Sequence, residues 1–138
     1  MDNAKLFEIA ETAAAASYSP YSNFRVGAAL VAMDGTVISG TNVENRSFGL
    51  TICAERSAIV AAMVAGHTRF AKIVVATPDS DQPVSPCGAC RQVLSEFMSS
   101  DAPVFFGSRL DNIVETTIGQ LLPHDSLHDL LEHDKKRE

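Results

Sequence analysis

The segment KIVVATP, residues 72–78, constrains the fold more than any other part of the chain. A short, unbroken apolar run is typical of a strand with both faces buried, because none of its positions alternates toward water. Helical patterns precede and follow it, over residues 52–65 and 86–98. The run therefore predicts a central strand in a sheet that is covered by helices.

The remaining segments predict four more strands and two further helices. Apolar residues recur at helical spacing over residues 3–16, and Asp34-Gly35 between two β-rich runs predicts a hairpin. In chain order we expect a helix at 3–16, a loop at 17–23, strands at 26–33 and 36–43, a helix at 52–65, a strand at 72–78, a helix at 86–98, strands at 103–108 and 112–118, and a helical tail from Ser126. This order predicts an α/β fold: a three-layer α/β/α sandwich with a mixed sheet of about five strands. We expect one domain over residues 1–138, with a flexible tail after about residue 131.

Composition and charge argue against several classes of function. The formal net charge of −6 disfavours a nucleic-acid partner, which would need a basic face. No apolar stretch reaches the length needed to span a bilayer, so a membrane is not an expected partner. The first residues lack a basic region before an apolar stretch, which predicts no signal peptide and hence a cytoplasmic location.

The three cysteines are spaced as metal ligands. Cys87 and Cys90 form a C-x-x-C, and Cys53 stands alone in the earlier segment TICAER. An odd number of cysteines without a secretion signal argues against a disulfide framework. Each group lies at the start of an expected helix, where the helix dipole stabilises the thiolate that a metal requires. If the two helices flank the central strand, the three thiolates can hold one zinc ion with its fourth position open, as in catalytic sites.

Two neighbours of Cys53 are candidates for roles around that zinc. Arg56 lies one helical turn away, so it can donate to the thiolates and offset their negative charge. Glu55 would point away from Cys53 on a regular helix, but near a helix end both can project into one cavity. We interpret Glu55 as a carboxylate that transfers protons without binding the metal.

Each part alone has a simpler interpretation. A lone cysteine is most often a small buried apolar residue, a lone C-x-x-C is shared by redox motifs and zinc knuckles, and a glutamate in a first turn usually complements the helix dipole. The combination is more specific. C-x-E followed about thirty residues later by P-C-x-x-C is the signature of the zinc nucleobase deaminases.

Over most of its length the chain resembles the small, homotetrameric, zinc-dependent cytidine deaminases. The segments that carry the resemblance are, in order, PYSNFRVGAAL (20–30), GTNVEN (40–45), GLTICAERSAI (49–59), SPCGACRQVL (85–94) and LLP (121–123). The resemblance implies hydrolytic deamination of cytidine and 2′-deoxycytidine to uridine and deoxyuridine in pyrimidine salvage. It also implies one Zn²⁺ per subunit and a homotetramer.

The resemblance further implies a role for individual residues. A zinc-bound hydroxide would attack C4 of the base, with Glu55 as the proton shuttle. The other implied residues are Cys53, Cys87 and Cys90 as zinc ligands, Arg56 as a support for the thiolates, Asn42 and Glu44 at the ribose hydroxyls, Phe24 against the base, the Ala54 backbone at the pyrimidine carbonyl, and the Ser85 carbonyl facing the departing amine.

The chain departs from the family pattern at three positions. Arg46 and Phe48 stand where the family usually has a small residue and a tyrosine, at positions that resemble those reaching a neighbouring subunit's site. Ser126 replaces a phenylalanine that many members donate to the neighbour's base pocket. We hypothesise that the wider pocket tolerates a bulkier group on the exocyclic nitrogen. Two alternatives therefore stay open: a deaminase of an N4-substituted or blasticidin S-like aminopyrimidine nucleoside, and a non-catalytic zinc-stabilised module.

Overall fold

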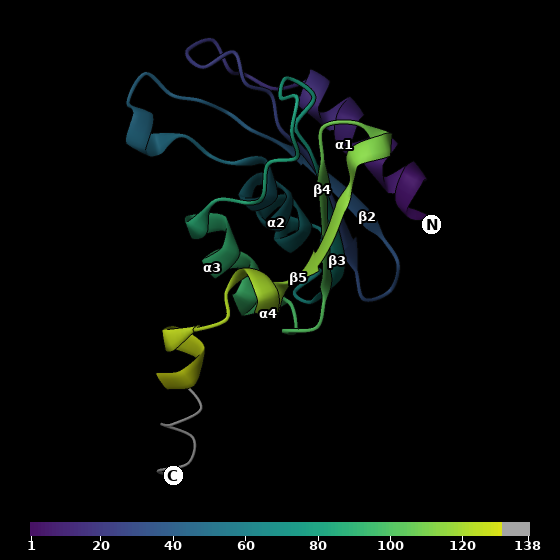
Figure 1. Cartoon of the computed structure of the whole chain (residues 1–138). Coiled ribbons are helices and arrows are strands. Elements are labelled where there is room, and N and C mark those ends of the chain that lie inside the picture. Colours follow the sequence, from purple (N-terminus) through teal and green to yellow (C-terminus); the bar gives the residue numbers. More distant parts are fainter. Residues whose placement is uncertain (131–138) are drawn as a thin grey trace.

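In the computed structural model, which describes residues 1–130, one five-stranded sheet lies between helices (Figure 1). The strand order is β2-β1-β3-β4-β5, with β3 at the centre. Only β3 and β4 pair in parallel among these neighbours, so the sheet is mixed as expected. The elements are α1 (Asn3–Ala15), β1 (Gly27–Ala32), β2 (Val37–Thr41), η1 (Phe48–Leu50), α2 (Ala54–Val64), β3 (Phe70–Ala76), α3 (Gly88–Phe97), β4 (Pro103–Gly107), η2 (Leu110–Asn112), β5 (Val114–Thr117) and α4 (Ile118–Leu121).

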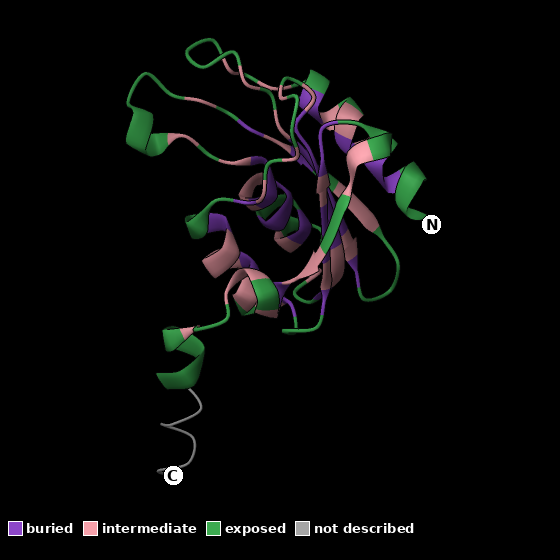
Figure 2. Cartoon of the chain, in the orientation of Figure 1, coloured by how far each residue is buried: buried purple, intermediate pink, exposed green. Residues whose placement is uncertain are grey.

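Two apolar cores, one on each face of the sheet, confirm the three-layer sandwich. Helix α1 buries Leu6 and Phe7 against Val74 and neighbouring residues on one face. Helices α2 and α3 cover the other face, where Ile73 and Val75 belong to the second core. Successive β3 residues thus alternate between two buried layers, which Figure 2 shows as buried segments in the middle of the molecule. The prediction of a central strand buried on both faces is confirmed.

Several boundaries differ from the expected ones: β3 covers Phe70–Ala76 rather than residues 72–78, and the two helices that carry the cysteines begin later than expected. Helix α2 begins at Ala54 rather than residue 52, because Cys53 has an extended backbone and is the N-cap. Helix α3 begins at Gly88 with Cys87 as its N-cap. Strand β2 ends at Thr41 because the following chain leaves the sheet, and Val43 pairs with Tyr18 and Ile52 instead. The short elements η1, η2 and α4 were not predicted.

The chain after α4 leaves the body of the molecule. Residues 126–130 are helical, as expected for the start of the tail. The expected flexible tail after about residue 131 lies outside the described residues. None of the helices within residues 1–130 combines the length and apolar character needed to cross a bilayer.

Gly40 on β2 sets how closely α2 approaches the sheet. A Cβ atom at this position would lie 2.4 Å from the Ala54 carbonyl oxygen and 2.4 Å from the Ala58 amide nitrogen. Both alanines are fully buried. A glycine is therefore required beside the first turn of α2, the turn that follows Cys53.

We expect Gly40→Ala to lower the free energy of unfolding by about 1–3 kcal/mol, because the added methyl overpacks this contact. Denaturant unfolding measures the change. Gly49→Ala is the matched control, since a Cβ at Gly49 would meet nothing within 4 Å, and its effect should stay within about 0.5 kcal/mol. Equal losses in the two variants would contradict the close-approach account.

Candidate functional site

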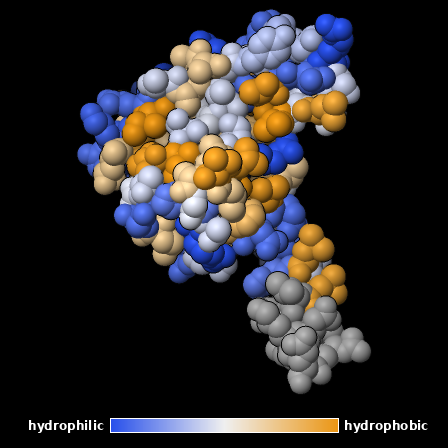
Figure 3. Space-filling view, turned by 180° about the vertical axis from the view of Figure 1, so that it is seen from behind, coloured by the Kyte–Doolittle hydropathy of each residue, from blue (hydrophilic) through white to orange (hydrophobic). Residues whose placement is uncertain are grey.

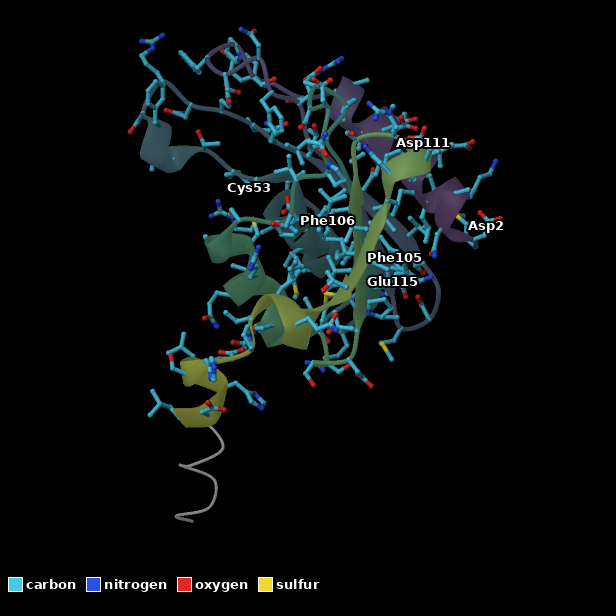
Figure 4. All side chains as sticks on the ribbon, in the orientation of Figure 1. Asp2, Cys53, Phe105, Phe106, Asp111 and Glu115 are labelled. Atoms are coloured by element: carbon cyan, nitrogen blue, oxygen red, sulfur yellow. The ribbon has the colours of Figure 1, made fainter. Side chains whose placement is uncertain are left out.

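The amino ends of α2 and α3 bring the three cysteines together. Cys53 and Cys87 are the N-caps of the two helices, and Cys90 lies in the first turn of α3. The three sulfur atoms all lie within 4.8 Å of one another, and Cys53 Sγ is 3.9 Å from Cys87 Sγ. Figure 4 labels Cys53 at the start of α2, where this helix faces α3.

This spacing fits one zinc ion. Tetrahedral zinc with Zn–S bonds of about 2.3 Å places its sulfur ligands about 3.8 Å apart, close to the distance between Cys53 and Cys87. Among residues 1–130, no fourth histidine, cysteine or carboxylate joins the cluster. Three soft thiolate donors with one position left for water or a substrate atom are the ligand set of a catalytic zinc site.

Positive charge converges on the same sulfurs. Arg56 Nη2 donates to Cys53 Sγ at 3.3 Å, and the Cys90 amide donates to Cys87 Sγ at 3.4 Å. Hydrogen bonding from the Cys90 thiol and from Arg56 lowers the pKa of Cys53 to about 5. The thiolate at Cys53, together with burial, raises the pKa of Cys90.

Glu55 is a buried carboxyl beside the sulfurs. Its side chain lies in the first turn of α2 and the residue is only 4% exposed. Burial, with a further contribution from the nearby Cys53 charge, raises its pKa to about 7. None of the ion pairs found within residues 1–130 involves Glu55. A buried carboxyl without an ionic partner is costly to the fold, so its position requires an explanation outside packing.

One cavity of about 430 Å³ lies in front of these groups. The carboxyl ends of β2 and β3 meet there, because Thr41 and Ala76 both pair with Gly27. Cys53 and Glu55 both line the cavity, which is possible because the extended Cys53 precedes the helix. The residues of the wall are Ser22, Phe24, Val26, Asn42, Glu44, Thr51, Cys53, Glu55, Val75, Thr77, Val84, Ser85 and Cys87.

The two polar residues expected at the sugar are already hydrogen-bonded to the chain. Asn42 Oδ1 accepts from the Val26 amide at 2.9 Å and from the Ser17 hydroxyl, and Asn42 Nδ2 donates to the Phe24 carbonyl at 2.8 Å. Glu44 Oε1 accepts from the Tyr21 and Ser22 amides at 3.0 and 3.2 Å, and Oε2 accepts from the Ser22 hydroxyl.

Besides Arg56, which donates to Cys53 Sγ, five of the expected residues lie outside the cavity wall of the described chain. Cys90 and Ala54 are buried behind it. Arg46 lines a separate groove, whereas Phe48 is 74% exposed and packs edge-on against Tyr21 at 5.7 Å. Ser126 is exposed at the start of the helical segment 126–130. Within one chain, then, Arg46, Phe48 and Ser126 do not meet the cysteines.

Two contributors to the site were missed from the sequence. Thr77 follows β3, and its buried hydroxyl finds no hydrogen-bond partner within residues 1–130. Arg91 donates to the Pro86 carbonyl, the Ser85 hydroxyl and the Leu121 carbonyl at 2.8, 2.9 and 2.9 Å, and so fixes the wall at Ser85. The position of Arg91 directly after Cys90 was the one feature of the sequence that could have indicated a role at the site. Its hydrogen-bond partners could not be predicted, because the fold brings them together.

Comparisons with known proteins agree with this geometry. Residues 1–106 match the model of the "Cytidine and deoxycytidylate deaminase zinc-binding region". The chain is 46% identical over 123 residues to a cytidine deaminase of Halalkalibacterium halodurans, covering 89% of this chain and 92% of that one. The crystal structure of a cytidine deaminase from Burkholderia pseudomallei superimposes with a TM-score of 0.85 at 45% identity, covering 89% of this chain and 98% of that one. A cytidine deaminase structure from Mycobacterium leprae gives 0.78 at 37% identity, covering 90% and 99%.

The family match, the close relatives and the three-cysteine cluster lead to one conclusion: the chain belongs to the zinc-dependent cytidine deaminase family of hydrolases.

Proposed function

We propose that this chain hydrolyses cytidine and 2′-deoxycytidine to uridine or deoxyuridine and ammonia, a pyrimidine salvage reaction. One observation carries the proposal: a cluster of three cysteine sulfurs, with no fourth protein ligand among residues 1–130, borders the cavity that the buried carboxyl of Glu55 also lines. A site of this kind combines an activated water with a group that can move protons.

Cys53, Cys87 and Cys90 would hold the zinc, which when bound makes a water molecule more acidic and more nucleophilic. Glu55 accepts a proton from this water and delivers it to N3 of the cytosine ring. It then takes the remaining proton of the hydroxyl group added at C4 and delivers it to the departing amine, so that the C4 carbonyl forms as the C–N bond breaks and ammonia leaves. Arg56 holds the Cys53 sulfur by its hydrogen bond and offsets part of the thiolate charge.

The cavity wall suggests how the rest of the nucleoside is held. Phe24 offers a ring face for the base. Arg91 orients Ser85 so that the Ser85 carbonyl can accept from the departing amine. Ala54 opens α2, where backbone amides have no acceptor within the helix, so its amide can donate to the pyrimidine carbonyl.

Hydrogen-bond capacity limits what the sugar-binding residues can recognise. Within the described chain, the bonds of Asn42 leave one N–H free, and those of Glu44 leave one acceptor position. One donor and one acceptor suit a single hydroxyl, which both donates and accepts. Because cytidine and 2′-deoxycytidine share the 3′-hydroxyl, we assign this pair to the 3′ position.

Exposed apolar surface supports a homotetramer. Figure 3 shows apolar side chains gathered across the middle of the rear face. Val64 on α2 is 91% exposed, and Leu127 and Leu130 are exposed on the segment 126–130, which stands away from the body in Figure 1. Such surface is typical of an interface. Assembly would let Arg46, Phe48 and Ser126 reach a neighbouring cavity, which they do not reach in their own chain.

The alternatives differ in how well they fit. A non-catalytic zinc module needs a fourth protein ligand, which the cluster lacks among residues 1–130. A deaminase of N4-substituted or blasticidin S-like nucleosides keeps the same chemistry, and in an assembly a small Ser126 contributed by a neighbouring subunit would leave room beside the base. We place cytidine first because Asn42, Glu44 and Phe24 suit a nucleoside, and the reduced thiols suit the cytoplasm.

We expect the purified zinc-loaded protein to convert cytidine with loss of its ultraviolet absorption band, and a zinc chelator to abolish the conversion. Added zinc should restore it, because the thiolate ligands rebind the metal. An N4-substituted cytidine assayed in parallel should react more slowly. Faster turnover of the substituted nucleoside would favour the alternative substrate, and an inert zinc-bound protein would favour the module.

Glu55→Gln should keep zinc and fold but lower kcat by about 10²–10⁴-fold, because the amide cannot accept and return a proton. Metal analysis and circular dichroism test retention of zinc and fold, and single-turnover assays measure the chemistry. Near-normal kcat in this variant would reject Glu55 as the proton carrier.

The single-hydroxyl argument predicts specificity toward the sugar. We expect kcat/KM for 2′-deoxycytidine within about tenfold of the cytidine value, and a loss of about 10²-fold or more for 3′-deoxycytidine, which leaves Asn42 and Glu44 with an unmet donor and acceptor. Steady-state kinetics on the three nucleosides provide the test. Equal losses for the two deoxy compounds would contradict the assignment to the 3′-hydroxyl.

A further inference from the structure

An ion pair joins two segments that are far apart in the sequence and that each lie next to residues of the cavity wall. Arg25 precedes β1 and Asp79 follows β3. The Arg25 guanidinium donates twice to Asp79, from Nε to Oδ2 at 3.0 Å and from Nη2 to Oδ1 at 2.7 Å. The Arg25 amide adds a third bond to Oδ2 at 2.8 Å. In Figure 1 the loops that carry the two residues lie beside each other above the sheet.

Both segments contribute to the cavity wall. Phe24 and Val26 flank Arg25, and both line the cavity. On the other side Thr77 lies two residues before Asp79, and the same loop continues to Val84 and Ser85. The ion pair thus connects the wall that we assign to the base with the wall that we assign to the departing amine.

The segment around Phe24 is held at two ends. Glu44 binds the Tyr21 and Ser22 amides at one end, and Asp79 binds the Arg25 amide at the other. Between them Asn23 has a φ of +56°, a left-handed conformation that is costly for most residues and acceptable for asparagine. Loss of the Asp79 contact would leave the segment that carries Phe24 held by Glu44 alone.

The ion pair differs from an ordinary surface pair. Exposed pairs usually contribute little, and the exceptions have bidentate geometry or form part of a network. This pair is bidentate and also binds backbone, and its side chains are 46% exposed at Arg25 and 25% exposed at Asp79. Hydrogen bonds from Arg25 lower the pKa of Asp79, so the carboxylate stays charged. The pair Arg109–Asp111 joins residues two apart, has one bond of 3.3 Å, and is 59% and 81% exposed.

We propose that Arg25 and Asp79 are positioning residues that hold the two walls of the cavity at the separation a nucleoside requires. The pair touches neither zinc nor the reacting atoms, so it acts on substrate affinity rather than on proton transfer. The proposal rests on the nucleoside deaminase function proposed above.

The test compares Arg25→Met, Asp79→Asn and the double variant with the wild type. We expect each single variant to raise KM for cytidine by about three- to tenfold with kcat within about twofold, and the double variant to match the single ones because the two residues act as a unit. Arg109→Met is the matched control, and its KM should not change. Thermal midpoints of all variants, measured alongside, confirm that assays are made on folded protein.

Amide hydrogen exchange gives a readout that does not depend on activity. Residues 21–26 and 79–85 should exchange faster in Arg25→Met than in the wild type or Arg109→Met. Any one of four results would overturn the proposal that Arg25 and Asp79 hold the two walls. These are an unchanged KM, additive effects in the double variant, an equal effect of Arg109→Met, and unchanged hydrogen exchange. Wild-type protein that is inactive on cytidine would reject the proposed function instead, and hydrogen exchange would still decide whether the pair holds the two segments.

Discussion

Three cysteine sulfur atoms within 4.8 Å of one another, which a bound zinc ion requires as thiolates, are the constraint on which the rest of the structure depends. Like charges so close together are strongly unfavourable in a partly buried site, unless positive charge is supplied from several directions. The chain supplies it from the amino ends of α2 and α3, from the Cys90 amide and from Arg56. Zinc completes the balance, and the buried carboxyl of Glu55 lies in the same cavity.

The sheet makes this convergence possible. Because α2 and α3 cover the same face, both helices point their amino ends at the edge where β2 and β3 finish. Gly40 lets α2 lie close enough to the sheet for Cys53 to meet Cys87. The residues just beyond the strands, Asn42 and Thr77, then line the cavity, and the loops joined by Arg25 and Asp79 contribute further lining residues.

The sequence was sufficient for features that depend on local patterns. The apolar run 72–78 predicted the central strand, and the cysteine spacing together with C-x-E predicted where the metal chemistry lies. Features that depend on contacts between distant segments could not be predicted. The segment NVEN does not indicate that Asn42 and Glu44 form most of their hydrogen bonds with residues 17–26. The sequence also does not indicate that Arg25 pairs with Asp79, 54 residues later. The predicted helix starts were two residues too early. The sequence does not show that Cys53 and Cys87 are N-caps, whose backbone is extended rather than helical.

The central claim is that Cys53, Cys87 and Cys90 hold one zinc with a single position left open beside Glu55. X-ray absorption spectroscopy at the zinc edge, combined with metal analysis, tests this claim directly. The account predicts one zinc per chain, with three sulfur ligands at about 2.3 Å and one oxygen or nitrogen ligand at about 2.0 Å. Replacing Cys53 by serine should lower the number of sulfur ligands to two. A coordination shell completed by a histidine of the chain, or a sulfur count that Cys53→Ser leaves unchanged, would contradict the account.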